Sequence, residues 1–291
     1  MRLYRITKDL SDNLLQGLSK LGLGNLSGMD IYEAEEEKPE KEVEKAVEVP
    51  QIKEEDFLFD KAYECPVCGE KFKSKTVKAN RAKLVGTDFD LRPRYQGIDI
   101  VKYDCVTCKS CGYSALTRFF NVMTETQAKL IKTNITPNFK GIKDSGDTYS
   151  YEDAYLKYQL ALANAVITKT KMSEKAYICL KLAWILRGMA ENVPDSESDK
   201  NATIARYKAE EQQYIAKAYE GFTVAAQKES FPICGMDDGT MSYLLAALAA
   251  KSGDNSNALR YLGEVISSKM TSERTKEKAR ELREFIKNNS K

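Results

Sequence analysis

The second half of the chain carries apolar residues at the spacing of an amphipathic α-helix. From residue 151 onward, apolar positions recur every three or four residues, and short stretches with proline, glycine or aspartate interrupt them. A helix that buries one face repeats every 3.6 residues, so this pattern predicts a succession of helices. The expected ranges are 151–168, 173–192, 199–228, 237–251, 256–268 and 272–288.

Several of these expected helices share a pattern that is typical of the second helix of a tetratricopeptide repeat. It occurs as Ala176/Leu180/Ala183, Ala218/Phe222/Ala225 and Ala258/Leu262/Val265. Alanines let antiparallel helices approach closely, and the larger residue fills the gap between units. Residues 146–291 are therefore predicted to form a tetratricopeptide-like helical domain. A plain helical bundle is the alternative, because the helix expected over 199–228 is too long for a standard unit.

The preceding segment, residues 57–145, has a pattern that favours strands. Aromatic residues between 57 and 63 fall at alternate positions, which predicts a strand. Phe72 marks the expected return of a hairpin, and Tyr103 and Val106 predict a later strand. A long inserted loop must lie between these two parts.

An exit helix is expected at the end of this segment. Apolar residues recur at helical spacing between 119 and 131, and Pro137 and Gly141 close the pattern. The predicted fold class is therefore α+β, with a small β domain over 57–145 followed by the helical domain over 146–291.

The N-terminal residues separate into two parts. Residues 1–32 include five leucines at helical spacing between Leu10 and Leu21, which predicts an amphipathic helix that docks on a later domain or binds a partner. Residues 33–56 contain eleven acidic and four basic residues, a net charge of −7. Low hydrophobicity with high net charge predicts a disordered acidic linker.

Two Cys-x-x-Cys-Gly motifs provide the candidate chemistry. Cys65 and Cys68 form the first pair, and Cys108 and Cys111 form the second. Two pairs of thiolates from two short turns match the spacing of a tetrahedral four-cysteine metal site. Cys105 creates an overlapping Cys-x-x-Cys register, but only the register of Cys108 is followed by glycine as in the first motif. Cys105 is thus expected to be a buried residue, or an occasional replacement ligand.

Four thiolate ligands suggest a structural role for the metal. Catalytic zinc sites keep one coordination position open for water, whereas four cysteines close the site. One structural Zn²⁺ ion is therefore expected in a zinc-ribbon-like domain. Iron in the same cage, which would make a one-electron carrier, is the alternative.

Composition narrows the functional classes. The 291 residues include no histidine, which excludes Ser-His-Asp and Cys-His catalysis, and no phosphate-binding glycine motif occurs. We therefore expect a protein that is not an enzyme. Seven cysteines without a disulfide-like pattern, no long apolar run and no signal-peptide pattern predict a cytoplasmic protein without membrane contact.

A basic stretch leaves a second type of partner open. Residues 57–133 hold fourteen Lys and Arg against eight Asp and Glu, a net charge of +6. The candidate contacts to phosphates and bases are Arg81, Lys83, Arg92, Arg94 and Tyr95. Aspartates at positions 88, 90 and 99 lie between these residues. Pairing of the arginines with these aspartates, which would fix the inserted loop, is the favoured interpretation, and nucleic acid or a protein-facing surface are the alternatives.

Four segments together resemble the bacterial domain-of-unknown-function 2225 family. They are Asp56–Lys61, Cys65–Cys68, Asp90–Tyr95 and Cys108–Tyr113, and the arginine–proline loop lies between the two cysteine pairs. The resemblance extends from about residue 56 to the end of the chain. It implies a bacterial cytoplasmic protein with a zinc-ribbon-like head and a tetratricopeptide-like tail, and it implies no reaction.

The sequence thus predicts a zinc-binding, non-enzymatic adaptor. Its helical domain is expected to present a surface for a protein or peptide partner. A nucleic-acid-associated factor that uses the arginine-rich insertion is the first alternative, and an iron or thiol redox protein is the second.

Overall fold

The computed structural model describes residues 53–289. The helix predicted over residues 1–32 and most of the linker predicted over 33–56 lie outside the described residues. The last three linker residues, Glu54 to Asp56, belong to a short 3-10 helix, η3 (Glu54–Phe57).

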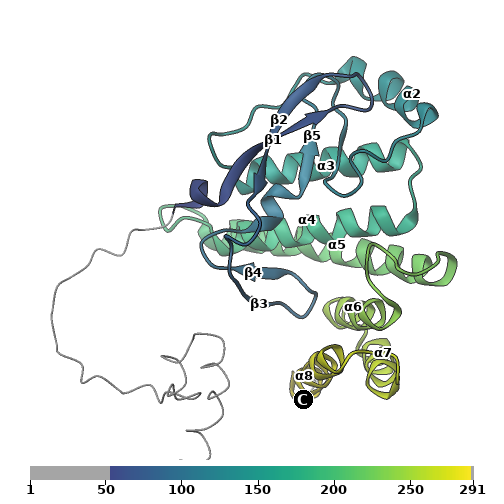
Figure 1. Cartoon of the computed structure of the whole chain (residues 1–291). Helices are drawn as coiled ribbons and strands as arrows, with labels where there is room; N and C mark the ends of the chain where they lie inside the picture. The colour runs from purple at the N-terminus through teal and green to yellow at the C-terminus, as the bar shows by residue number, and fades with distance from the viewer. Residues whose placement is uncertain (1–52, 290–291) are drawn as a thin grey trace, which may run out of the picture. The chain divides into compact units, whose positions relative to one another are not determined.

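The N-terminal part of the described chain contains three two-stranded antiparallel sheets (Figure 1). Their strands are β1 (Leu58–Glu64) with β2 (Lys71–Val77), β3 (Leu84–Thr87) with β4 (Pro93–Tyr95), and β5 (Cys105–Thr107) with β6 (Ser114–Leu116). Tyr63 lies directly opposite Phe72 across the first sheet, and their rings stack with centroids 6.0 Å apart. The hairpin return expected at Phe72 is therefore confirmed.

The strand expected through Tyr103 is partly wrong. Tyr103 ends a 3-10 helix, η4 (Ile100–Tyr103), and the strand begins at Cys105. Asp99 caps η4 by accepting a hydrogen bond from the Val101 amide at 3.0 Å, which favours a helical turn here over an extended strand.

The remaining regular elements of the described chain are helices. They are α2 (Glu125–Asn134), η5 (Thr136–Asn138), α3 (Tyr151–Ile167), α4 (Met172–Glu191), α5 (Lys200–Lys228), α6 (Asp238–Lys251), α7 (Asn255–Ser267) and α8 (Glu273–Asn289). The six helices expected after residue 150 are confirmed, and each boundary lies within one residue of its expected position. No helix between residues 53 and 289 combines the length and apolar character needed to cross a membrane.

The exit helix begins later than expected. Thr124 caps α2 through a capping box with Gln127, so the helix starts at Glu125 rather than near Phe119. Phe120 is fully buried in the turn before the helix, where Tyr113 donates a hydrogen bond to its carbonyl oxygen at 2.9 Å. Phe119 and Phe120 thus contribute to the cores without being helical.

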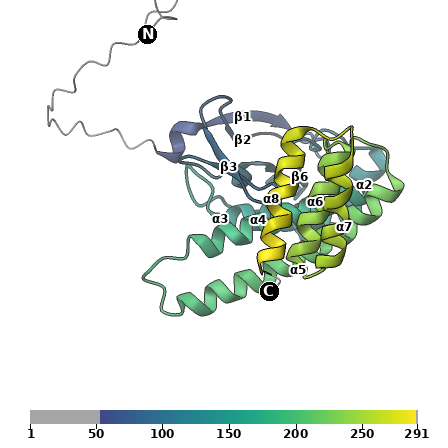
Figure 2. The ribbon, with the colours of Figure 1, turned by 90° about the horizontal axis from the view of Figure 1, so that it is seen from below.

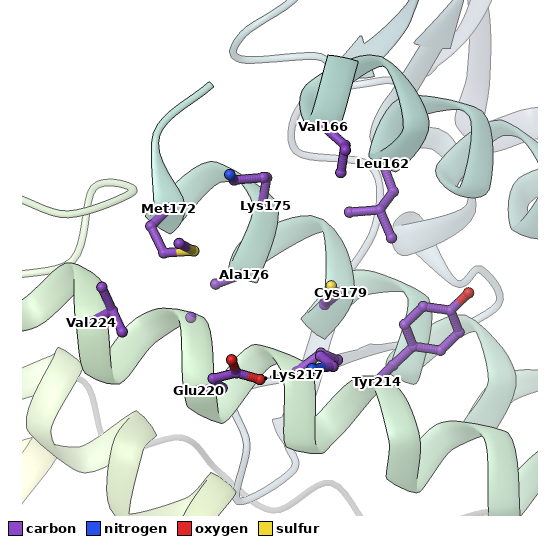
Figure 3. A pocket seen from close by; sticks show the side chains of 11 residues that line it. Leu162, Val166, Met172, Lys175, Ala176, Cys179, Tyr214, Lys217, Glu220 and Val224 are labelled. Atoms are coloured by element: carbon purple, nitrogen blue, oxygen red, sulfur yellow. Dashed lines mark hydrogen bonds and ion pairs between the residues drawn. The ribbon is translucent and has the colours of Figure 1, made fainter. Parts of the chain in front are cut away.

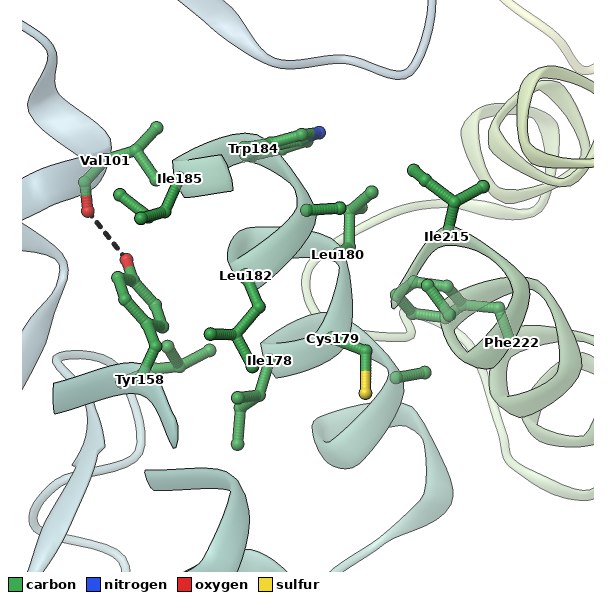
Figure 4. Close-up of a cluster of buried hydrophobic side chains, with 14 of the residues drawn as sticks. Val101, Tyr158, Ile178, Cys179, Leu180, Leu182, Trp184, Ile185, Ile215 and Phe222 are labelled. Atoms are coloured by element: carbon green, nitrogen blue, oxygen red, sulfur yellow. Dashed lines mark hydrogen bonds between the residues drawn. The ribbon is translucent and has the colours of Figure 1, made fainter. Parts of the chain in front are cut away.

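One core joins the strand region to the helices. It surrounds α4, which packs between α3 and α5 and is buried on nearly all sides (Figure 4). Val101 and Leu116 from the strand region belong to this core, and the Tyr158 hydroxyl on α3 donates to the Val101 carbonyl at 2.7 Å. The two predicted domains, 57–145 and 146–291, therefore share a hydrophobic core.

The C-terminal helices α6, α7 and α8 pack side by side (Figures 1 and 2). All nine residues of the three alanine patterns are buried, on α4, α5 and α7. This burial agrees with their expected role in helix packing. The more specific tetratricopeptide interpretation stays a prediction.

Candidate metal centre and helical groove

The first Cys-x-x-Cys-Gly motif forms the turn between β1 and β2, and we call residues 65–70 the first knuckle. The Cys65 amide donates to the Glu70 carbonyl at 2.9 Å, and the Gly69 amide donates to the Cys65 carbonyl at 2.9 Å. Gly69 has a φ of +76°, a region that residues with a side chain rarely adopt. Glycine therefore lets the chain turn sharply enough to place both cysteines on the same side.

The second motif repeats this geometry between β5 and β6, and we call residues 108–113 the second knuckle. The Cys108 amide donates to the Tyr113 carbonyl at 2.8 Å, and the Gly112 amide donates to the Cys108 carbonyl at 3.0 Å. Gly112 has a φ of +79°. The two motifs thus produce the same turn at the ends of two separate hairpins.

The two knuckles bring four thiols together. The Sγ atoms of Cys65, Cys68, Cys108 and Cys111 all lie within 4.8 Å of one another. The Sγ atoms of Cys65 and Cys111 are 3.6 Å apart, and those of Cys68 and Cys108 are also 3.6 Å apart. Four sulfurs at about 2.3 Å from a central zinc ion would be separated by about 3.8 Å. A disulfide would require about 2.05 Å, so the four residues are free thiols that could hold one metal ion.

The thiols influence one another's protonation. A hydrogen bond with Cys111 lowers the pKa of Cys65 to about 5, and the same bond raises the pKa of Cys111. Burial raises the pKa of Cys108 to about 11. Four adjacent thiolates would repel one another, and a bound cation removes this cost, so metal binding would displace protons from the cluster.

Cys105 lies apart from this cluster. Its thiol is 1% exposed, 3.3 Å from the Ser114 hydroxyl and 3.4 Å from the Lys157 carbonyl. Burial raises its pKa to about 12, so it is a protonated residue of the core. The structure therefore places it where sequence analysis expected a buried residue on the incoming strand.

An aromatic core packs beside the four thiols. The rings of Tyr63, Phe72 and Tyr113 each lie within 6.0 Å of Phe120, measured between centroids. Ile131 of α2 joins the same cluster and is fully buried. This small core joins the two hairpins and the exit helix around the thiols.

The two knuckles differ in their connections to the helices. On the second knuckle, Asn164 of α3 donates to the Gly112 carbonyl at 3.0 Å, and Thr136 donates to the Cys111 carbonyl at 2.9 Å. On the first knuckle, Cys68 is exposed, and a Cβ atom added to Gly69 would meet no atom within 4 Å. The second knuckle is therefore anchored to the helices, whereas the first exposes Cys68 and Gly69 to solvent.

A family model covers the thiol cluster and the helices together. It is described as an uncharacterized protein conserved in bacteria (DUF2225), and it matches residues 58–286. The chain belongs to this family. No curated protein matches the chain, and no solved structure does either.

In this DUF2225 protein, two arginines of the insertion, Arg92 and Arg94, are paired with carboxylates of the structure. Arg92 is 1% exposed and donates to Asp99 at 2.7 Å and to Glu191 at 3.2 Å. Arg94 donates to Asp88 at 2.8 Å and to Glu191 at 2.6 Å. The geometry thus matches the favoured interpretation of internal pairing, and Arg92 has no surface available for a phosphate.

The pairing extends to a helix that sequence analysis had not linked to the insertion. Arg187 of α4 donates to Asp88 at 2.6 Å, to the fully buried Asp90 at 3.0 Å and to Glu211 of α5 at 2.7 Å. Burial alone would raise the pKa of Asp88, but hydrogen bonds from the arginines lower it below its ordinary value. Arg187 and Glu191 lie one turn apart directly after an apolar stretch of α4, residues 182–186, and this was the available signal in the sequence.

The five candidate nucleic-acid contacts do not form one surface. Arg81 and Lys83 are exposed, and Tyr95 is half-buried and packs against the apolar cluster around Phe57. The two arginines of the Arg-Pro-Arg stretch are paired with carboxylates as described above. No observation within residues 53–289 therefore favours nucleic acid as a partner of the insertion.

An apolar groove lies between α3, α4 and α5 (Figure 3). Its volume is about 290 Å³, and its apolar lining includes Leu162, Val166, Met172, Ala176, Tyr214 and Val224. A Cβ atom added to Gly221 of α5 would lie only 2.8 Å from the Cβ of Ala176, so α4 and α5 touch through small residues there. Larger side chains surround these small residues and leave the groove between them.

Proposed function

We propose that this protein is a non-enzymatic adaptor. Its four-thiol centre holds one structural zinc ion, and its helical region binds a protein or peptide partner in the apolar groove. A reducing compartment such as the cytoplasm would keep the seven free cysteines in the thiol form.

The zinc assignment rests on the donor set. Four cysteine thiolates at the spacing of a tetrahedron match a structural zinc site, and they leave no coordination position open for water. Zinc would hold the two hairpins together, because each sheet has only two strands and is not stable alone. Elemental analysis of protein purified without added metal should find one zinc per chain. Iron, or no metal, would contradict the assignment.

The groove supports the adaptor role because it exposes apolar side chains. Val166 is 57% exposed and Met172 is 40% exposed, and both line the groove. Exposed apolar surface that is gathered into a concave patch is characteristic of interaction sites. The charged residues Lys175, Lys217 and Glu220 line the same groove, as expected where an apolar centre has a polar rim.

Site-specific photo-crosslinking tests this role. The full chain carrying p-benzoylphenylalanine at Val166 is expressed in bacterial cells and irradiated. Leu156 is a matched control position, since it lies on the same helix, is 53% exposed and does not line the groove. We expect a covalent product from position 166 that position 156 does not give. If the two positions give the same pattern, the groove is not the partner site.

A further inference from the structure

We infer that the segment bound in the groove between α3, α4 and α5 is an acidic amphipathic helix. This inference rests on the adaptor role proposed above and specifies the chemistry of the partner. Three observations carry it: the backbone of the lining, the size of the groove, and the charge at one of its ends.

The lining offers almost no backbone hydrogen bonds to a ligand. Every lining residue belongs to α3, α4 or α5, and its amide and carbonyl groups are bonded within the helices or at their ends, except for the amide of Met172, which is the first residue of α4. An extended peptide would find no strand edge to pair with, so its backbone polar groups would be left unpaired wherever the groove excludes water. A helix satisfies its own backbone and needs only side-chain contacts, which this lining supplies.

The size of the groove suits a few side chains. Its volume of about 290 Å³ lies at the lower end of the range of roughly 300–1,000 Å³ that is typical for small-molecule sites. Side chains of the three helices α3, α4 and α5 line the groove (Figure 3). A partner helix would insert apolar residues at positions i, i+4 and i+7 and leave its other face in water.

The charge near Met172 favours an acidic partner. Residues 169–175, which include the start of α4, contain three lysines and one glutamate, and the Glu229 carboxylate accepts hydrogen bonds from Ser173 in this segment, so positive charges exceed negative ones by one. Within residues 53–289, none of these lysines forms an ion pair with a carboxylate at 4.0 Å or less. The other charged pair of the rim, Lys217 and Glu220, is joined at 2.8 Å and neutralises itself. Carboxylates on one end of a partner helix would complement the free lysines.

The same charge argues against a second copy of this chain. A symmetric dimer formed through the groove would place the identical patch on both sides of the interface. Both copies would then contribute the lysines at positions 169, 171 and 175 to one interface, which would carry an excess of positive charge. Like charges facing each other destabilise an interface, so self-association through this surface is disfavoured.

The experiment extends the crosslinking at Val166. Mass spectrometry of the product identifies the captured segment, and two labelled synthetic peptides are made from it. One copies the segment, and the other has every Asp and Glu replaced by Lys. Fluorescence anisotropy with the full chain at low salt should show binding of the acidic peptide that is at least about tenfold tighter than binding of the basic one.

Two double variants test whether the lysines near the groove cause the preference for the acidic peptide. Lys171→Glu combined with Lys175→Glu should abolish the preference for the acidic peptide, and both changes are compatible with the first turn of α4, where negative charge is favourable. Lys208→Glu combined with Lys269→Glu changes the net charge equally at exposed positions outside the groove and should retain the preference.

The outcomes separate this inference from the proposed function. No product specific to position 166 would overturn both. Three outcomes would overturn the inference of an acidic helical partner. They are a captured segment without helical apolar periodicity, equal affinity for the two peptides, and capture of a second copy of this chain. Capture of a basic or extended segment from another protein would leave the adaptor role standing.

Discussion

The two knuckles have the same backbone and different surroundings. In both, a glycine with positive φ follows the second cysteine, and the same two backbone hydrogen bonds close the turn. The second knuckle lies against α3 and the segment after α2, and both of its cysteines are buried. In the first knuckle, Cys65 is buried, but Cys68 is exposed. An identical local motif therefore specifies the turn, whereas tertiary packing decides how strongly each turn is held.

The largest difference is expected from replacing one cysteine in each knuckle. Cys108→Ser and Cys68→Ser should both abolish stoichiometric metal binding, because a tetrahedral site needs all four ligands. Cys108 is fully buried, so its variant should also lose more stability than the Cys68 variant, by about 1–3 kcal/mol, since a hydroxyl would be buried among thiols. Elemental analysis and thermal unfolding measure the two effects.

Cys105→Ser is the control for this comparison. Its thiol lies outside the cluster, so the variant should keep its metal even if its stability falls. Loss of metal from this variant, or retention by the Cys108 variant, would show that the ligand register is wrong.

Acid should release the metal from both knuckles together. The loaded site holds thiolates, whereas the metal-free cluster holds protons on Cys108 and Cys111, whose pKa values are raised. The metal-free state therefore binds more protons, so affinity falls as pH falls. With at least two protons displaced, the apparent affinity should change by about 100-fold per pH unit near neutrality. Competition with a chromophoric chelator between about pH 6 and 8 measures this slope, and a slope near zero would contradict the thiolate site.

The two glycines provide the next comparison. Gly69→Ala and Gly112→Ala impose the same backbone strain of about 1–2 kcal/mol, because both residues have positive φ. At Gly112 the new Cβ would also lie 2.8 Å from the Phe139 ring and 3.0 Å from Ile135. This overpacking should add about 1–3 kcal/mol. Chemical denaturation of the two zinc-loaded variants measures the difference, and equal losses would mean that the second knuckle is not tightly packed.

Sequence reasoning succeeded where the determining signal was local. Helical periodicity and the proline, glycine or aspartate stretches that interrupt it predicted the helix boundaries, where Ser150 and Asp254 cap α3 and α7 in the structure. The Cys-x-x-Cys-Gly motifs indicated which thiols would meet. It failed at Tyr103 and Phe119, because aromatic residues fill a core equally well from a strand, a 3-10 helix or a turn.

Long-range partners had no comparable signal. Arg92 and Glu191 are 99 residues apart, and Asn164 lies 52 residues from Gly112. Such pairs form only after the hairpins and helices have packed, so no spacing rule in the sequence identifies them. The alternation of Arg and Asp in the insertion indicated internal pairing, but it could not show that α4 supplies Arg187 and Glu191.

Removing the contact between Asn164 and the second knuckle should give the smallest of the effects that distinguish the two knuckles. Asn164→Ala removes the hydrogen bond to the Gly112 carbonyl and should cost about 1–3 kcal/mol, because a buried acceptor loses its partner. Asn134→Ala is the matched control. Asn134 is exposed on α2 and donates to the carbonyl four residues earlier, as Asn164 does on α3. If α3 anchors the second knuckle, the Asn164 variant should also release zinc to a chelator several-fold faster than the control. Equal release rates would mean that the four thiolates alone hold the second knuckle in place.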